Sequence, residues 1–150
     1  MSQSLVCVNC HLIFSTKERA PLISEELSPR LLDYIGGIVR NQRACLVAAG
    51  AVPDHVHLVV SLGKELSVAA AVRLIKSNSS GWIHETYPQL QDFAWQVGYG
   101  AFSVSHSNMN RVTQYVGRQR EHHRVRTFQD ELREFLKRHN VEYDERYVWN

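Results

Sequence analysis

Two histidines, His55 and His57, are the residues of this chain whose types and spacing point most directly to chemistry. They lie in residues 52–60 (VPDHVHLVV), a pattern typical of a β-strand that follows a turn at Pro53-Asp54. Successive strand side chains point to opposite faces, so the two imidazoles share one face, about 7 Å apart. Burying two such groups costs free energy unless each has a partner, so they are either structural residues with polar partners or half of a metal site.

A second pair, Tyr115 and Gln119, is four residues apart in residues 108–124, which we expect to be helical, so the two side chains stack on one helix face. The Gln119 amide oxygen is a hard ligand. Imidazole with oxygen ligands and no thiolate suits Mg²⁺ or Mn²⁺ better than structural zinc. We therefore expect His55, His57 and Gln119 to be metal ligands.

Tyr115, one turn from Gln119, would reach a phosphate bound to the same ion. A tyrosine hydroxyl has a pKa of about 10 and is a poor nucleophile at neutral pH. The ion would therefore help by polarising a phosphodiester and orienting the bond for in-line attack. The alternative is a structural tyrosine, half-buried against the sheet.

Composition sets wide limits on function. The 150 residues are 44% apolar and 21% charged, which is ordinary for one globular domain with a real core. The net charge of +2 does not by itself indicate nucleic acid, so phosphate binding must come from a local patch. No apolar run has the length of a membrane span and the N-terminus lacks the pattern of a signal peptide, so we expect a cytoplasmic protein.

The three cysteines, Cys7, Cys10 and Cys45, are an odd number in a chain without an export signal, which argues against a disulfide scaffold. Residues 7–11 (CVNCH) match the spacing for covalent haem attachment. That chemistry normally belongs to exported proteins, and the segment has the branched and apolar residues of a strand. The sequence therefore disfavours a haem or zinc site here.

The elements that must position these residues follow from apolar periodicity and turn residues. We expect strands at about 5–15, 43–52, 55–61 and 93–105, and helices that begin near Ser28-Pro29, Ser67, Asn108 and Thr127. The first six elements read β-α-β-β-α-β. The expected class is therefore α+β, a ferredoxin-like split βαβ arrangement with an antiparallel sheet and helices on one face. A catalytic helix, a C-terminal helix and a docked aromatic tail follow.

Five segments together resemble a known family: residues 52–54 (VPD), 55–60 (HVHLVV), 11–19 (HLIFSTKER), 95–99 (WQVGY) and 115–119 (YVGRQ). The histidine-hydrophobe-histidine strand resembles the HUH motif, and 115–119 resembles the segment with a nucleophilic tyrosine and a third metal ligand. The chain is similar, in order and over nearly its whole length, to the single-tyrosine HUH transposases of small bacterial insertion sequences. Its segment from Thr127 onward looks like that of relatives associated with repeated extragenic palindromes.

The resemblance implies an activity, a cofactor and partners. Such proteins cut and rejoin single-stranded DNA at the ends of a mobile element, as homodimers, and recognise DNA hairpins. Tyr115 would form a 5′-phosphotyrosine and leave a free 3′-OH, with Mg²⁺ or Mn²⁺ on His55, His57 and Gln119. The cations that could contact DNA phosphates are Lys17, Arg19, Arg111, Arg118, Arg120 and Arg124.

The resemblance also implies that residues 1–150 form one domain, with a core at about 5–105, the tyrosine helix at 108–124 and a C-terminal helix and tail at 127–150. It implies association with the nucleoid during action. Two other functions remain open. One is a non-catalytic or domesticated protein that binds single-stranded nucleic acid on the same fold. The other is a metal-dependent hydrolase in which water, not Tyr115, attacks the phosphate. For the transposase, it is also open whether Tyr115 acts in cis or in trans.

Overall fold

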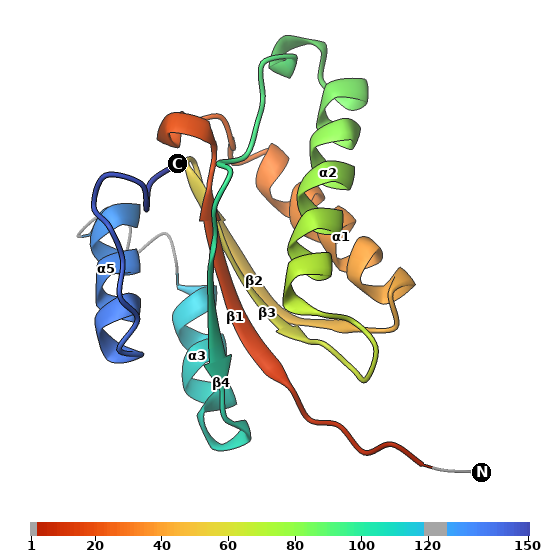
Figure 1. Cartoon of the computed structure of the whole chain (residues 1–150). Helices are drawn as coiled ribbons and strands as arrows, with labels where there is room; N and C mark the ends of the chain where they lie inside the picture. Colours follow the sequence, from red (N-terminus) through yellow and green to blue (C-terminus); the bar gives the residue numbers. More distant parts are fainter. Residues whose placement is uncertain (1–2, 119–125) are drawn as a thin grey trace.

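A four-stranded antiparallel sheet forms the centre of the computed structural model, which describes residues 3–118 and 126–150 (Figure 1). The strands are β1 (Asn9–Ser15), β2 (Cys45–Val52), β3 (His55–Ser61) and β4 (Gly100–Val104). Their order in the sheet is β2-β3-β1-β4, with every neighbouring pair antiparallel. This confirms the predicted ferredoxin-like arrangement.

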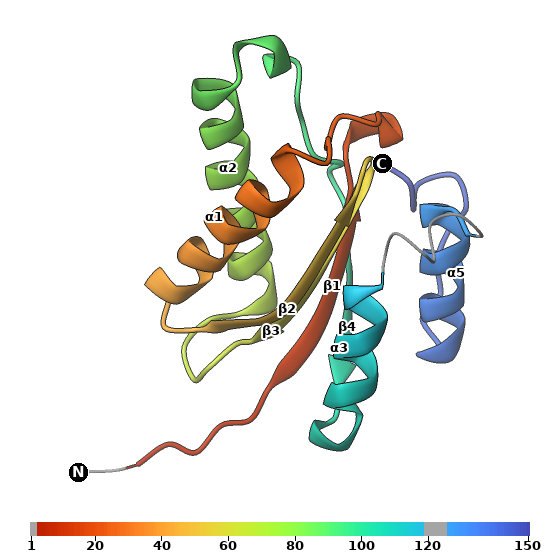
Figure 2. The ribbon, with the colours of Figure 1, turned by 180° about the vertical axis from the view of Figure 1, so that it is seen from behind.

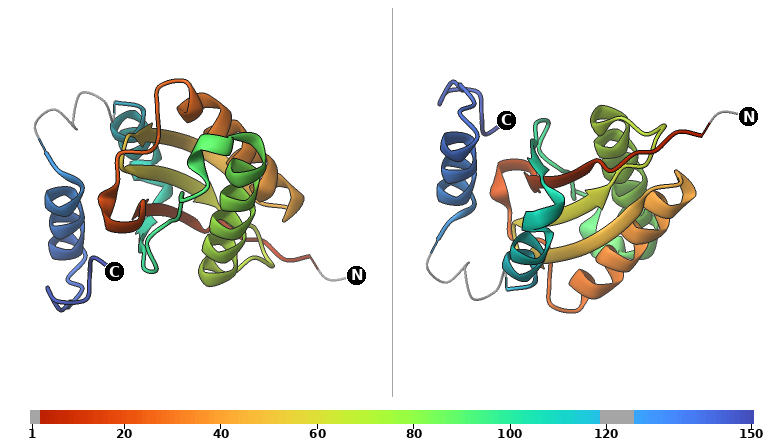
Figure 3. Two further views of the ribbon diagram at one scale, coloured as in Figure 1. Left: turned by 90° about the horizontal axis from the view of Figure 1, so that it is seen from above. Right: turned by 90° about the horizontal axis from the view of Figure 1, so that it is seen from below.

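Helices cover both faces of the sheet (Figures 1 and 2). α1 (Leu27–Asn41) and α2 (Val68–Thr86) lie on one face, as predicted, while α3 (Met109–Gly117) and α5 (Phe128–Arg138) lie on the other (Figure 3). Short 3-10 helices occur at Lys17–Arg19, Pro88–Leu90 and His106–Asn108. Within the described residues, no helix is long and apolar enough to cross a membrane.

Strand alternation divides β1 between two cores. Leu12 and Phe14 are fully buried in the larger core, under α1 and α2. Ile13 points to the opposite face, where it packs with Phe102 and Phe128 under α5. The sheet face that α3 and α5 cover therefore has an apolar cluster of its own. The histidines of β3 point to the same face.

Two strand predictions were too long. β1 begins at Asn9 instead of residue 5, and Leu5 is 83% exposed. Residues 93–99 were predicted to be strand, but they leave the sheet apart from a single bridge between Thr16 and Trp95. The reason is that Trp95 turns into the larger core and its Nε1 donates a hydrogen bond to Ser79 Oγ on α2, at 3.0 Å.

The helix starts predicted near Ser67 and Thr127 agree with the structure, and both residues cap their helices. Ser67 Oγ accepts a hydrogen bond from Ala70 N at the start of α2, and Thr127 Oγ1 accepts one from Asp130 N at the start of α5. α1 differs, because it begins at Leu27, whose N–H donates to Ser24 Oγ. Ser28, near which the helix was predicted to begin, instead lies inside it, and Pro29 is tolerated there because the first-turn N–H groups have no helical partner.

The chain after α5 returns to the fold, as predicted. Val148 and Trp149 pack against the smaller apolar cluster, and Asn150 O accepts a hydrogen bond from Gly98 N. Of the predicted helix at 108–124, the structure describes Met109–Gly117 as α3, and the part from 119 onward lies outside the described residues.

Candidate metal and nucleophile site

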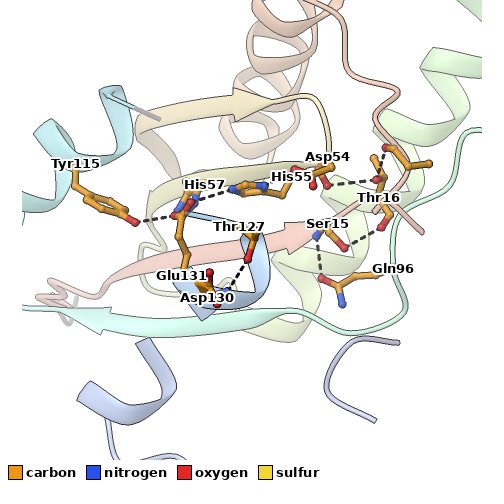
Figure 4. A network of polar contacts seen from close by, with 11 residues as sticks. Ser15, Thr16, Asp54, His55, His57, Gln96, Tyr115, Thr127, Asp130 and Glu131 are labelled. Carbon is orange, nitrogen blue, oxygen red and sulfur yellow. Dashed lines mark hydrogen bonds and ion pairs between the residues drawn. The ribbon is translucent and has the colours of Figure 1, made fainter. Parts of the chain in front are cut away.

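Three fully buried side chains meet between β3 and α5 (Figure 4). His57 Nε2 lies 2.9 Å from Glu131 Oε2, and His55 Nε2 lies 3.5 Å from Glu131 Oε1. One ligand atom from each residue falls within 4.8 Å of the others. Two imidazole nitrogens and a carboxylate aimed at one place are a donor set that fits a divalent ion.

Glu131 is the residue of this site that the sequence analysis missed. It lies on the buried face of α5, three residues after Phe128 and directly before Leu132. The apolar face of that helix was identified, but the carboxylate on it was not. A charged residue at an apolar-face position is costly unless it is paired, so that position was the available indication.

The Nδ1 atoms of both histidines also have hydrogen-bond partners. Asp54 Oδ1 lies 2.7 Å from His55 Nδ1, and His11 Nε2 lies 2.7 Å from His57 Nδ1. These contacts turn both Nε2 atoms toward Glu131. Metal-binding histidines typically have this kind of outer partner, which fixes the tautomer and the ring orientation.

The protonation states follow from burial and charge. Burial, with the nearby His57, lowers the pKa of His11 to about 3, so its imidazole is neutral at pH 7. Burial opposes the charged forms of His55 and Glu131 as well. Hydrogen bonds with Asp54 and Glu131 nevertheless raise the pKa of His55, and those from His55 and His57 lower the pKa of Glu131. Glu131 is therefore an ionised carboxylate available to a cation.

Tyr115 completes the cluster from α3. Its hydroxyl donates a 2.6 Å hydrogen bond to Glu131 Oε2, and its ring lies edge-on to His57 with the centroids 5.7 Å apart. Val116, the next residue, is fully buried and fixes α3 on the sheet. The described chain thus brings a potential nucleophile to its own histidine pair.

The structure describes only some of the other predicted site residues. Lys17, Arg111 and Arg118 are exposed, and Arg19 is partly buried. Gln119, Arg120 and Arg124 lie outside the described residues. Arg19 and Lys17 border a cavity of about 490 Å³ that also contacts Trp95 and Trp149. The structure therefore brings His55, His57 and Tyr115 together and adds Glu131.

Residues 4–119 match the protein family described as "Transposase IS200 like". The chain belongs to this family. Among characterised relatives it is similar to the ISDra2 transposase TnpA of Deinococcus radiodurans, with 25% identity over 116 residues that cover 74% of this chain and 83% of the relative. This confirms the resemblance found in the sequence.

Two solved structures share the fold. One is a putative transposase from Deinococcus radiodurans, with a TM-score of 0.65, 24% identity, and coverage of 79% of this chain and 98% of the other. The second is a tyrosine transposase associated with REP sequences and bound to a REP hairpin, with a TM-score of 0.60, 16% identity, and coverage of 82% and 74%.

The family assignment confirms the predicted function, a transposase acting on single-stranded DNA, over a non-catalytic binding module. A transposase cleaves DNA and transfers strands, so the chain is an enzyme of that class. The group of His55, His57 and Glu131 is consistent with a divalent metal cofactor.

Proposed function

We propose that the transposase cuts single-stranded DNA by direct attack of Tyr115 on the scissile phosphate. The Oη–phosphorus bond forms as the phosphorus–O3′ bond breaks, giving a 5′-phosphotyrosine, while the hydroxyl proton passes to Glu131 and the leaving O3′ takes up one proton to become a free 3′-OH. The linkage keeps the energy of the phosphodiester, so attack by a 3′-OH reseals the strand. The observation that carries this proposal is the hydrogen bond from the Tyr115 hydroxyl to Glu131 Oε2, which joins the tyrosine to the histidine pair.

Glu131 has two roles in this proposal. Its Oε2 accepts the hydrogen bond of the Tyr115 hydroxyl and so orients it. At 2.6 Å this oxygen is within the hydrogen-bond distance that a proton acceptor needs. With His55 and His57 it would also hold the metal, which we propose is Mg²⁺ or Mn²⁺. When bound, that ion would polarise the phosphodiester. Gln119, the third ligand predicted from the sequence, stays a predicted ligand.

Access to this site requires movement on the α5 side. His55, His57 and Glu131 are all fully buried beneath α5 in the described structure. A phosphate cannot reach fully buried nitrogens, so we propose that residues around the site move when DNA binds while Glu131 stays beside the histidine pair.

We propose DNA hairpins at element ends as the substrate, since one structural relative is bound to a REP hairpin. The exposed cations Lys17, Arg111 and Arg118, with Arg19, would contact phosphates. A homodimer is also part of the proposal. Within it we propose that Tyr115 acts in cis, because the tyrosine already lies beside His57 of its own chain.

The test uses a labelled single-stranded hairpin oligonucleotide pool, with random nucleotides on both sides of the hairpin, incubated with Mg²⁺ or Mn²⁺. We expect an SDS-resistant protein–DNA adduct that Tyr115→Phe abolishes. Cleavage that persists without an adduct in Tyr115→Phe would instead support attack by water.

Mixing two inactive variants tests the cis assignment. Tyr115→Phe and His57→Ala lack different parts of the site, so a dimer that works in trans would regain one complete site in the mixture. We expect no recovery of adduct formation. Recovery to a substantial fraction of the native yield would show action in trans.

A further inference from the structure

Two hydrogen-bond donors converge on one oxygen next to the metal and nucleophile site. Gly98 N lies 2.7 Å from Asn150 O, and Gln96 Nε2 lies 3.3 Å from the same atom. Gln96 is only 4% exposed, so its side-chain amide is held inside the fold. A buried donor such as the Gln96 amide is costly when it has no acceptor.

The Gln96 donor is oriented by β1. Ser15 N–H donates a 2.8 Å hydrogen bond to Gln96 Oε1, a contact drawn in Figure 4. With Oε1 engaged by the backbone, the amide nitrogen must point away from the strand, toward Asn150. The donor is therefore fixed by a contact that does not involve its acceptor.

The Gly98 donor is oriented from the opposite side by α2. Lys76 Nζ donates to the carbonyl oxygens of Gln96, Val97 and Gly98, at 2.8, 3.2 and 2.6 Å. In a planar trans peptide the Val97 C=O and the Gly98 N–H point in opposite directions. Because Lys76 holds the carbonyl, the N–H faces the Asn150 side.

Gln96 and Asn150 line the cavity of about 490 Å³ that the Lys17–Arg19 segment borders, and Gly98 directly follows Val97, which also lines it. That volume lies within the range of small-ligand sites. Lys17, Arg19 and Trp149 line the cavity, so it offers cations for phosphate and an aromatic side chain for a base.

The cavity is also close to the histidine pair. Ser15, which holds Gln96, pairs directly with His55 across the β1–β3 ladder, and neighbouring strands are about 4.8 Å apart. A strand of DNA whose phosphate reached the histidine pair would therefore have an adjacent nucleotide beside Gln96.

We propose that Gln96 and Gly98 form a subsite for a nucleotide next to the scissile phosphate, where a base carbonyl oxygen takes the place of Asn150 O. This rests on the proposed function. A carbonyl oxygen has two lone pairs and can accept both hydrogen bonds, whereas each ring nitrogen of adenine has one. Guanine, thymine and cytosine carry such an oxygen and adenine does not. The subsite thus discriminates against adenine at one position.

The test measures base preference by sequencing the strands that the protein binds from the randomised hairpin pool, at fixed salt. We expect adenine to be depleted by about fivefold or more at one position beside the cleavage point. Gln96→Glu keeps the oxygen that accepts from Ser15 but removes the donor, so the depletion should disappear. Gln91→Glu is the matched control, because Gln91 is exposed and bonds His84 O instead, and it should keep the native preference.

Gly98→Ala is an independent second variant. It keeps the N–H, but its Cβ would lie 2.9 Å from the present position of Asn150 O and so block an acceptor there. We expect the same loss of preference in a protein that still folds cooperatively, with a melting temperature lowered because Asn150 is displaced. Unchanged adenine depletion in both folded variants would overturn the subsite.

Adduct formation separates this inference from the proposed function. A native protein that forms the Tyr115 adduct without depleting adenine at any flanking position would refute the subsite and leave the function standing. A native protein that forms no adduct, but whose base preference depends on Gln96, would support the subsite and refute the proposed chemistry.

Discussion

The Tyr115 hydroxyl donates a 2.6 Å hydrogen bond to Glu131 Oε2, the same oxygen that lies 2.9 Å from His57 Nε2. The tyrosine comes from α3 and the carboxylate from α5, while the histidine belongs to the sheet. One carboxylate oxygen therefore connects the potential nucleophile to the potential metal site. The position of α5 decides whether this connection exists.

Glu131→Gln should weaken metal binding. The substitution keeps the size of the side chain but removes the negative charge from a buried three-ligand group. We expect the affinity for Mn²⁺ to fall by more than about tenfold, measured by isothermal titration calorimetry. Glu134→Gln, the same change on a less buried part of α5, should bind as the native protein does. Equal affinities in the native protein and Glu131→Gln would exclude Glu131 as a ligand.

His11→Phe should weaken metal binding without removing a ligand. His11 Nε2 lies 2.7 Å from His57 Nδ1, and phenylalanine keeps the ring packing against Phe135 but not this contact. Loss of such an outer partner typically lowers metal affinity by about 10–100-fold. The measurement is Mn²⁺ titration, with the exposed His106→Phe as control. An unchanged affinity would mean that His57 needs no orienting partner.

Gly100→Ala should loosen α5 from the sheet. A Cβ at this position would lie 2.8 Å from Ile13 and 2.9 Å from Leu132, closer than packed carbons tolerate. We expect a loss of about 1–3 kcal/mol in the free energy of unfolding, measured by urea denaturation, together with weaker Mn²⁺ binding. Gly81→Ala is the matched control, since its Cβ would meet no atom within 4 Å and a helical alanine stabilises by about 0.5–1 kcal/mol. Similar effects of the two substitutions would contradict the packing argument.

Cys10 should be the slowest thiol to alkylate. Burial raises the pKa of the Cys10 thiol to about 11, so about 0.1% is thiolate at pH 8 and the fraction rises with pH. Cys7 and Cys45 are exposed. Iodoacetamide labelling followed by mass spectrometry should show Cys10 modified last at pH 8. Labelling of all three at one rate would show that β1 is not buried as described.

Much of the fold and half of the site could be predicted from local patterns. The alternation around His55 and His57 placed both imidazoles on one face, and the capping residues Ser67 and Thr127 located two helix starts. These features depend on neighbours in the sequence, which is why periodicity detects them.

The features that were missed depend on distant contacts. Residues 93–99 have the composition of a strand, but they leave the sheet because Trp95 turns into the larger core, and Lys76 on α2 then binds the carbonyls of Gln96 to Gly98. Glu131 belongs to the site only because α5 folds back over β3, which no local pattern in residues 127–138 specifies. Its place on the apolar face was the one available indication.

Attack by Tyr115 is tested most directly by identifying the residue that becomes attached to DNA. The protein–DNA adduct is digested with nuclease and protease, and mass spectrometry locates the modified peptide. We expect a 5′-linked nucleotide on Tyr115 in the native protein and no modified peptide in Tyr115→Phe. A nucleotide on another side chain, or an adduct of equal yield in Tyr115→Phe, would contradict attack by Tyr115.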